Sequence, residues 1–318
     1  MPDDNSSVVI ENLLKQFGDF VAVDRINLEI HKGEVFGFLG PNGAGKSTTI
    51  RMLCGLLTPT SGRAQVAGYD VGREPESVRQ NIGYMSQKFS LYNDLKVIEN
   101  IRLFAGLYSV PSNQLKGRIE WALEMASLKG RENLITGTLP GGWKQRLALG
   151  CAVLHKPPVI FLDEPTSGVD PISRRQFWDL IHQMAEEGVT VFVTTHYMEE
   201  AEYCNRLALI FRGRIVALGT PSELKQKSMK GELLLVECDP LGKAVEVLQS
   251  APDVMDAAVF GNALHLVVRD ATAAAPQIEK YLSEHSITVS HIEKIRPSLE
   301  DVFVSLTTAS DSGKEWKA

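Results

Sequence analysis

Residues 40–47 read Gly40-Pro41-Asn42-Gly43-Ala44-Gly45-Lys46-Ser47, which matches the pattern G-x-x-x-x-G-K-[ST]. An apolar run, EVFGFL at 34–39, leads into these glycines, and a helix is predicted from about Lys46 to Leu57. Between a buried strand and a helix N-terminus, glycines let successive backbone N–H groups turn inward and form a nest for anions. In this pattern Lys46 reaches the β- and γ-phosphates, and the Ser47 hydroxyl holds Mg²⁺. The stretch from Gly40 to Thr48 is therefore predicted to bind nucleotide phosphate.

The order of the glycines argues against two other nucleotide sites. They run G-x-x-G-x-G, the reverse of the order in dinucleotide-binding folds, where the Lys46-Ser47 pair has no role. A P-loop GTPase or kinase is a second alternative. The chain lacks the NKxD motif that reads guanine, and that alternative leaves the glycines at 141–142 unexplained.

A second candidate site lies at the end of another predicted strand. VIFL at 159–162 is a buried-strand run that ends in Asp163 and Glu164. In P-loop ATPases an Asp in this position helps to hold Mg²⁺. Glu164, one residue further on, sits where a general base can polarise an attacking water. The roles predicted for these two carboxylates, a Mg²⁺ ligand and a general base, are consistent with the predicted nucleotide-phosphate site.

Composition narrows the class of protein. The 318 residues include 33 Lys and Arg against 39 Asp and Glu, a formal net charge of −6, which disfavours sequence-independent nucleic-acid binding. Four separated cysteines without a CxxC pair argue against a disulfide scaffold or zinc site and predict reduced thiols in a cytosol. The opening MPDDNSSVVI is acidic and polar, unlike a signal peptide, and no apolar run reaches the roughly 18–20 residues of a membrane span. The chain is expected not to enter a bilayer by itself.

Strands and helices alternate over residues 8–220, which predicts an α/β domain with a mixed, mostly parallel sheet and a helical subdomain at about 90–155. A hairpin at 207–218 ends this domain. Residues 221–306 follow the order β-α-β-β-α-β, which predicts a small α+β ferredoxin-like domain. Residues 307–318 are predicted to form a flexible tail.

Further motifs follow one another in an order that resembles the nucleotide-binding subunit of an ABC transporter, over roughly residues 8–220. The motifs are Phe17 at the position that stacks on adenine, Lys46, Gln87 as the Q-loop glutamine, LPGGWKQR at 139–146 as the signature, Asp163-Glu164, SGVD at 167–170 as the D-loop, and TTH at 194–196 with the switch histidine. PSLEDVF at 297–303 resembles the end of the accessory domain of ABC-2-type exporter ATPases, including drug-efflux subunits.

The resemblance implies ATP and Mg²⁺ as ligands and assigns a role to each matched residue. It implies that Glu164, Gln87 and His196 are catalytic, and that Ser47, Gln87 and Asp163 hold the metal. The implied nucleotide contacts are Phe17, Gly40, Pro41, Asn42, Gly43, Ala44, Gly45, Lys46, Ser47, Thr48, Pro140, Gly141, Gly142, Gln145 and Asp170.

The resemblance also implies partners. In the family two cassettes pair head to tail, so that Gly141-Gly142 of one cassette caps the γ-phosphate bound by the other, and hydrolysis lets the halves separate. One complete motif set therefore implies a dimer, with a second copy or with a sister cassette. The implied location is the cytoplasmic face of the cell membrane, where the chain is peripheral and docks on a separate integral-membrane permease through about 91–105.

Pro140 departs from the family pattern, which usually has Ser at this position. Proline supplies neither a hydroxyl nor a backbone N–H, although it is tolerated where a helix begins, so slower hydrolysis or a weaker nucleotide sandwich is expected. The alternative function is a soluble ABC ATPase that acts on ribosomes or chromosomes. Ribosomal members usually carry two cassettes, and chromosomal members insert coiled coils before the signature. This chain has one cassette and no sustained heptads there.

Overall fold

The computed structural model describes residues 5–87, 91–227 and 231–311. The chain divides into two compact units, residues 1–218 and 219–318. Of the helices in the described ranges, none combines the length and the apolar character that a membrane crossing requires.

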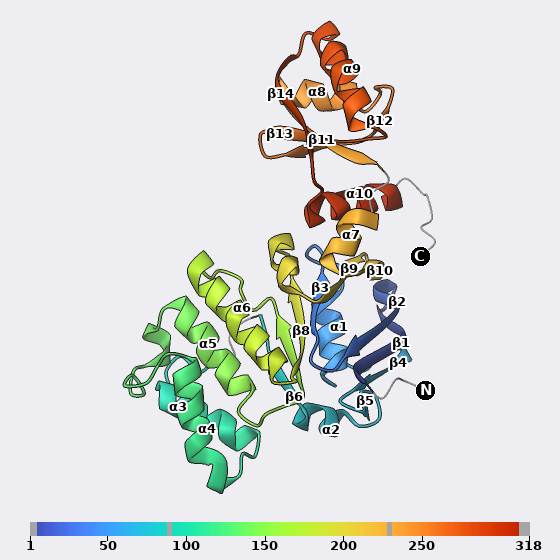
Figure 1. The fold of residues 1–318 in the computed structure, drawn as a ribbon. Helices are drawn as coiled ribbons and strands as arrows, with labels where there is room; N and C mark the ends of the chain where they lie inside the picture. Colours follow the sequence, from blue (N-terminus) through green and yellow to red (C-terminus); the bar gives the residue numbers. More distant parts are fainter. Residues whose placement is uncertain (1–4, 88–90, 228–230, 312–318) are drawn as a thin grey trace. The chain divides into compact units, whose positions relative to one another are not determined.

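A six-stranded sheet lies at the centre of the first unit (Figure 1), and its strand order is β10-β9-β3-β8-β7-β6. Its strands are β3 (Val35–Leu39), β6 (Ile82–Met85), β7 (Val159–Asp163), β8 (Thr190–Thr195), β9 (Arg206–Phe211) and β10 (Arg214–Gly219). The pairs β6–β7, β7–β8, β8–β3 and β3–β9 are parallel, so the carboxyl ends of β3, β7 and β8 meet at one edge. Every side chain of β3, β7 and β8 is buried, as expected for strands covered on both faces.

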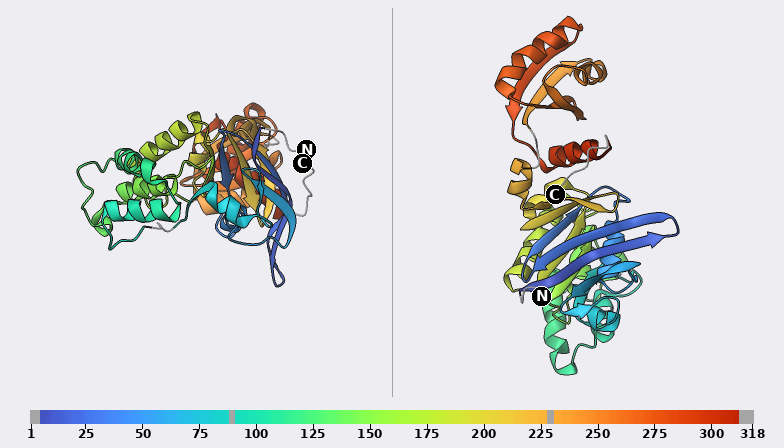
Figure 2. Two further views of the ribbon diagram at one scale, coloured as in Figure 1. Left: turned by 90° about the horizontal axis from the view of Figure 1, so that it is seen from below. Right: turned by 90° about the vertical axis from the view of Figure 1, so that its right-hand side faces the viewer.

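An antiparallel sheet forms a second layer (Figure 2), in the order β2-β1-β4-β5. Its strands are β1 (Ser6–Phe17), β2 (Phe20–His31), β4 (Ser61–Val66) and β5 (Tyr69–Asp70). Helix α1 (Lys46–Leu53) shares one hydrophobic core with both sheets, through residues such as Ile50, Phe38 and Ile10. The helix is shorter than predicted, because Cys54 caps it and Gly55 follows with a φ of +65°.

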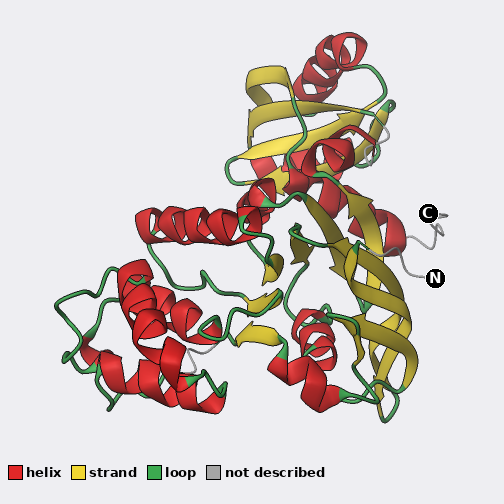
Figure 3. Ribbon diagram, turned by 60° about the horizontal axis from the view of Figure 1, so that its bottom comes forward, coloured by secondary structure: helices red, strands yellow, loops and turns green. Residues whose placement is uncertain are grey.

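Helices make up the rest of the first unit, and Figure 3 shows a lobe that is almost entirely helical. They are α2 (Pro75–Gln80), α3 (Val97–Leu107), α4 (Ser112–Met125), α5 (Gly141–Ala152) and α6 (Pro171–Glu186), with short 3₁₀ helices η1 (Thr136–Thr138) and η2 (Met198–Tyr203). Helices α3, α4 and α5 pack together over the predicted helical subdomain, around buried side chains such as Ile101, Leu123 and Leu147.

The second unit has the predicted strand and helix order. Its elements are α7 (Pro221–Lys227), β11 (Glu232–Asp239), α8 (Leu241–Leu248), β12 (Val254–Phe260), β13 (Ala263–Val268), α9 (Ala271–Glu284), β14 (Thr288–Ile295) and α10 (Leu299–Asp311). The strand order is β12-β13-β11-β14 and every pair is antiparallel, which is the ferredoxin-like arrangement. Alternate side chains of β11 and β13, such as Leu234 and Leu266, pack under α8 and α9.

One prediction about the end of the chain is wrong. Residues 307–311 do not begin a loose tail, because they continue α10 as far as Asp311. The buried side chains Leu299, Val302 and Leu306 give this helix an apolar face. The rest of the predicted tail, 312–318, lies outside the described residues.

Candidate functional site

The predicted phosphate loop joins the end of β3 to the start of α1. Gly45 has a φ of +110°, and a Cβ at this position would lie 2.5 Å from the Ala22 carbonyl oxygen, so both the backbone and the space require glycine. Lys46 and Ser47 open the helix directly after it. The loop therefore ends at a helix N-terminus, whose first N–H groups have no acceptor within the helix and favour an anion.

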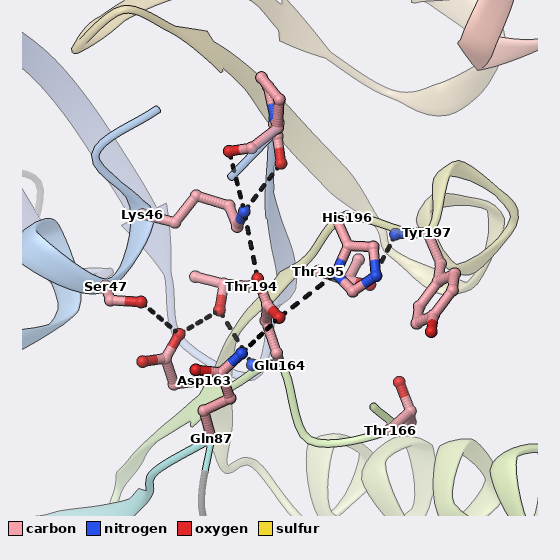
Figure 4. Close-up of polar contacts among 12 residues, drawn as sticks. Lys46, Ser47, Gln87, Asp163, Glu164, Thr166, Thr194, Thr195, His196 and Tyr197 are labelled. Carbon is pink, nitrogen blue, oxygen red and sulfur yellow. Dashed lines mark hydrogen bonds and ion pairs between the residues drawn. The ribbon is translucent and has the colours of Figure 1, made fainter. Parts of the chain in front are cut away.

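Lys46 lies beneath this loop and is only 4% exposed. Its ammonium donates to the carbonyl oxygens of Gly40 (2.8 Å) and Pro41 (3.2 Å), and it lies 3.2 Å from Oε1 of Glu164 (Figure 4). A buried ammonium needs such partners because desolvation penalises its charge. The side chain is thus held at the loop, next to the proposed general base.

Asp163 is buried and accepts two hydroxyl hydrogen bonds. Ser47 Oγ donates to its Oδ1 at 3.2 Å and Thr194 Oγ1 donates to the same oxygen at 2.8 Å. The Ser47 hydroxyl and the Asp163 carboxylate are oxygen ligands of the kind that Mg²⁺ prefers. The donor set therefore fits the predicted metal. The role of Thr194 was not predicted, although the residue belongs to the TTH stretch at 194–196.

Three predicted residues converge on the carboxylate of Glu164, which is 7% exposed. Besides Lys46, Gln87 Nε2 donates to its Oε2 at 2.9 Å, and His196 Nδ1 lies 3.2 Å from the same oxygen. The Glu164 backbone is left-handed, with a φ of +48°, and its N–H donates to the carbonyl and to the hydroxyl of Thr194, both at 3.1 Å. A left-handed backbone at a non-glycine residue costs free energy. The two hydrogen bonds to Thr194 stabilise this conformation, which sets the direction of the Glu164 side chain.

Phe17 lies at the end of β1, where it pairs with Phe20 across the turn. It is 49% exposed, and the ammonium of Lys15 lies 5.0 Å from the centre of its ring. An exposed aromatic ring offers a stacking surface, which suits the predicted contact with adenine. Phe20 is 63% exposed and offers a second such ring that was not predicted.

The predicted signature residues lie elsewhere, at the start of α5. Pro140 is the residue before this helix, and the N–H groups of Gly141 and Gly142 open it. A Cβ added at Gly142 would overlap Ser173 of α6, whereas nothing lies near a Cβ at Gly141. The signature lines a groove together with the D-loop. Lining residues are Pro140, Gly142, Trp143, Gly168, Asp170 and Ser173.

Two predicted nucleotide contacts have structural roles. Gln145 is fully buried and its Nε2 donates to the Pro165 carbonyl oxygen, so it supports the segment after Glu164. Asp170 caps α6 by accepting from the Ser173 N–H at 3.0 Å. This backbone hydrogen bond lowers the pKa of the Asp170 carboxyl below its ordinary value.

Two family models match the chain, one over each unit. Residues 23–167 match the ABC transporter family, and residues 219–307 match the C-terminal domain of the ATP-binding protein DrrA1-3-like family.

Several curated proteins are similar in sequence. The chain is 52% identical over 222 residues to the probable multidrug ABC transporter ATP-binding protein YbhF of Escherichia coli, a match that covers 70% of this chain and 38% of that protein. It is 36% identical to the linearmycin resistance ATP-binding protein LnrL of Bacillus subtilis, covering 93% of this chain and 97% of that one. It is 34% identical to the daunorubicin resistance ATP-binding protein DrrA3 of Streptomyces coeruleorubidus, covering 95% and 96%.

Solved structures match the first unit. A dimeric bacterial ABC transporter cassette has a TM-score of 0.61 at 28% identity and covers 67% of this chain and 98% of that chain. The cbiO1 protein of Clostridium perfringens, part of an ABC transporter complex, has a TM-score of 0.65 at 28% identity and covers 70% and 92%. The chain belongs to the ABC transporter ATPases, in the group that carries a DrrA-like C-terminal domain. This confirms the predicted family and fold class.

Proposed function

We propose that this chain binds and hydrolyses ATP to power a separate membrane permease of an ABC-2-type exporter. The observation that carries the proposal is the convergence of Lys46, Gln87 and His196 on the buried carboxylate of Glu164. Relatives that match nearly the whole chain are named for resistance to linearmycin and daunorubicin, which supports export as the direction of transport.

The contacts of Lys46 suggest how ATP engages the site. Phosphate oxygens at the loop compete with Glu164 for the same ammonium, because Glu164 Oε1 lies only 3.2 Å from it. Ser47 and Asp163, with Gln87 nearby, would hold Mg²⁺, which would supply positive charge next to the phosphates. Glu164 is then free to accept a proton from water, while Gln87 and His196 keep its second oxygen oriented.

One phosphate loop stabilises only one side of the triphosphate, and phosphoryl transfer needs support around the whole transition state. Gly141 and Gly142 line a groove together with the D-loop, and within the described residues no hydrogen bond joins them to Lys46, Ser47 or Glu164. We infer that they cap the γ-phosphate held by a second copy of the chain. The two copies close on ATP and separate after hydrolysis.

A surface of the helical subdomain suits the permease. The segment 132–137 runs beside 93–98, joined by backbone bonds such as Val97 N–H to the Leu134 carbonyl (3.0 Å) and Gly137 N–H to the Asn93 carbonyl (2.8 Å). Apolar side chains are exposed along these segments and α3. They are Tyr92, Leu103, Leu107, Leu134 and Ile135. Docking here places the chain at the cytoplasmic face of the membrane; the predicted segment 91–105 supplies part of this surface, although its Ile101 belongs to the core.

The test uses the Glu164→Gln variant with ATP and Mg²⁺, followed by light scattering. Removal of the base should trap the ATP-bound form and convert the monomer to a dimer, while Lys46→Ala should stay monomeric because it loses the phosphate contact. A monomer that still binds ATP would overturn the pairing of two identical copies. Failure of the wild-type chain to bind ATP would overturn the whole proposal.

A further inference from the structure

Another buried carboxylate, besides Asp163 and Glu164, lies near the site and takes no part in the mechanism above. Glu200, in η2, is 1% exposed. Thr166 Oγ1 donates to its Oε1, and the Nε of Arg174 lies 3.4 Å from the same oxygen. Its other oxygen, Oε2, is buried and has no hydrogen-bond partner within the described residues. Burial of a carboxylate is costly, so this one requires an explanation.

Glu200 and its partner Thr166 belong to the two segments that carry the proposed catalytic pair, Glu164 and His196. Thr166 lies two residues after Glu164, and Glu200 lies four residues after His196. Arg174, from α6, contacts the His196 segment twice, because its guanidinium lies 3.4 Å from Glu200 and 4.5 Å from the centre of the Tyr197 ring. Helix α6 follows the Glu164 segment along the chain, so these contacts join the His196 segment to the helix that continues the Glu164 segment. In Figure 4 Thr166 and Tyr197 lie to the right of Glu164, away from Lys46.

The pairing of β7 with β8 ends where the Glu164 N–H donates to Thr194, and beyond that point the contact between the His196 and Glu164 side chains links the two segments at the site. His196 Nδ1 lies 3.2 Å from Glu164 Oε2, and the His196 ring is about one third exposed. The segment after β8 also holds itself through the Tyr197 N–H, which donates to Thr195 Oγ1 at 3.0 Å. Neither contact fixes the distance from the His196 loop to the segment after β7. Glu200 and Thr166, which are both buried, supply a second link between them, and the half-buried Arg174 adds to it.

We propose that Glu200 is a positioning residue for ATP hydrolysis, which holds the His196 segment against the Glu164 segment through Thr166 and Arg174. The inference rests on the proposed function, since it assumes that Glu164 and His196 act on ATP. The carboxylate is suited to this task because it accepts a hydroxyl hydrogen bond and pairs with a guanidinium at the same time. An uncharged amide keeps the first interaction and weakens the second.

The first test compares Glu200→Gln with Glu199→Gln, which changes the exposed neighbouring carboxylate on the same 3₁₀ helix. Single-turnover hydrolysis by Glu200→Gln should be about tenfold slower or more, because misplacement of a catalytic group by about 1 Å costs on the order of 10²-fold. The dissociation constant for ATP should stay within about twofold, because the phosphate loop is not touched. Glu199→Gln should match the wild type in both measurements.

A general loss of structure is separated from positioning by adding His196→Ala. If Glu200 acts through His196, then Glu200→Gln should slow hydrolysis in the His196→Ala background by less than about twofold, since residues that act as one unit are not additive. Losses that multiply in the double variant, or a Glu200→Gln rate equal to that of Glu199→Gln, would overturn the proposal. Should Glu200→Gln fail to fold, Thr166→Val removes only the hydroxyl partner of Glu200. We then expect the same slower hydrolysis and the same lack of additivity with His196→Ala.

A readout without nucleotide keeps this proposal separate from the proposed function. In NMR spectra of the ¹³C-histidine-labelled chain, the His196 ring signal is identified by its loss in His196→Ala. Glu200→Gln should shift this signal and Glu199→Gln should leave it in place. If the wild-type chain has no ATPase activity, the proposed function fails while this shift still tests the link. An unmoved His196 signal in Glu200→Gln would refute the link whatever the activity.

Discussion

Replacement of Thr194 by Val tests how the carboxyl end of β7 is held in shape. Thr194 is fully buried, and its hydroxyl donates to Asp163 and accepts from the Glu164 N–H. Valine keeps the shape of the side chain and removes only the hydroxyl. The Glu164 N–H retains the Thr194 carbonyl as an acceptor, so the main loss is the donor to a buried carboxylate.

The expected cost follows from that loss. A buried charged acceptor that loses a donor costs about 2–3 kcal/mol of unfolding free energy. If the free energy of unfolding falls by about 3 kcal/mol per M urea, the unfolding midpoint should fall by about 0.7–1 M. Thr194→Ser is the matched control, because it keeps the hydroxyl and loses one buried methyl group, worth about 1 kcal/mol.

The assay is urea unfolding followed by tryptophan fluorescence. Trp121, Trp143 and Trp178 lie in the first unit, so a Trp316→Phe background, which removes the fourth tryptophan, makes the signal report the cassette. Mg²⁺-dependent ATP binding gives a second readout, and Thr194→Val should weaken it about tenfold or more because the hydroxyl orients a metal ligand. An unfolding midpoint for Thr194→Val equal to or above that of Thr194→Ser would refute the reasoning.

Three further predictions concern other parts of the chain. Pro140→Ser should raise the ATPase rate about threefold or more, because Ser adds a hydroxyl and an N–H near the γ-phosphate; an unchanged or lower steady-state rate contradicts this. Burial raises the pKa of the Asp256 carboxyl above its unfolded value. The loss of folding stability caused by the buried carboxylate is therefore absent below the unfolded pKa and complete once the pH exceeds the folded pKa. Asp256→Asn should therefore raise the melting temperature by about 1–3 °C at pH 7 and leave it unchanged at pH 3, as calorimetry will show. Burial also raises the thiol pKa values of all four cysteines, but the cysteines at 54, 151 and 204 are buried whereas Cys238 is partly exposed. A maleimide at pH 7 should therefore label Cys238 first, and mass spectrometry that finds Cys151 labelled at the same rate contradicts this.

Local patterns were enough to predict most of the elements. The glycines at 40–45 require one loop geometry, and the runs at 34–39 and 159–162 are short, apolar and bounded, so each predicted strand lies within about one residue of the observed one. The end of α1 was missed although Gly55 follows it, a common glycine position after a helix. The pattern of apolar positions continued past that signal, which led to the longer helix.

The positions of the site residues that were not predicted, Thr194 and Glu200, depend on contacts between segments that are distant in the sequence. Thr194 meets Asp163 because β7 and β8 are parallel neighbours in that register, a long-range pairing that a strand pattern does not contain. Glu200 is one of three glutamates in MEEAEY at 198–203, and periodicity does not distinguish the buried one from Glu199. The resemblance assigns Gln145 to the nucleotide, and the hydrogen bond from its amide to the Pro165 carbonyl is a further long-range contact that the sequence pattern does not contain.

The contacts of Glu164 link nucleotide binding to activation of the base. Lys46 and Glu164 are both buried and pair at 3.2 Å, so the ammonium cannot turn to phosphate without weakening its hold on the carboxylate. Loss of that contact leaves Oε1 of Glu164 free to approach an attacking water, which is what a general base requires. Gln87 and His196 contact the other oxygen, Oε2, so they keep the side chain aimed while Oε1 changes partner. The proposed function therefore predicts that Oε1 of Glu164 changes partner when phosphate binds at the loop, while Oε2 keeps its contacts with Gln87 and His196 and so keeps the base oriented.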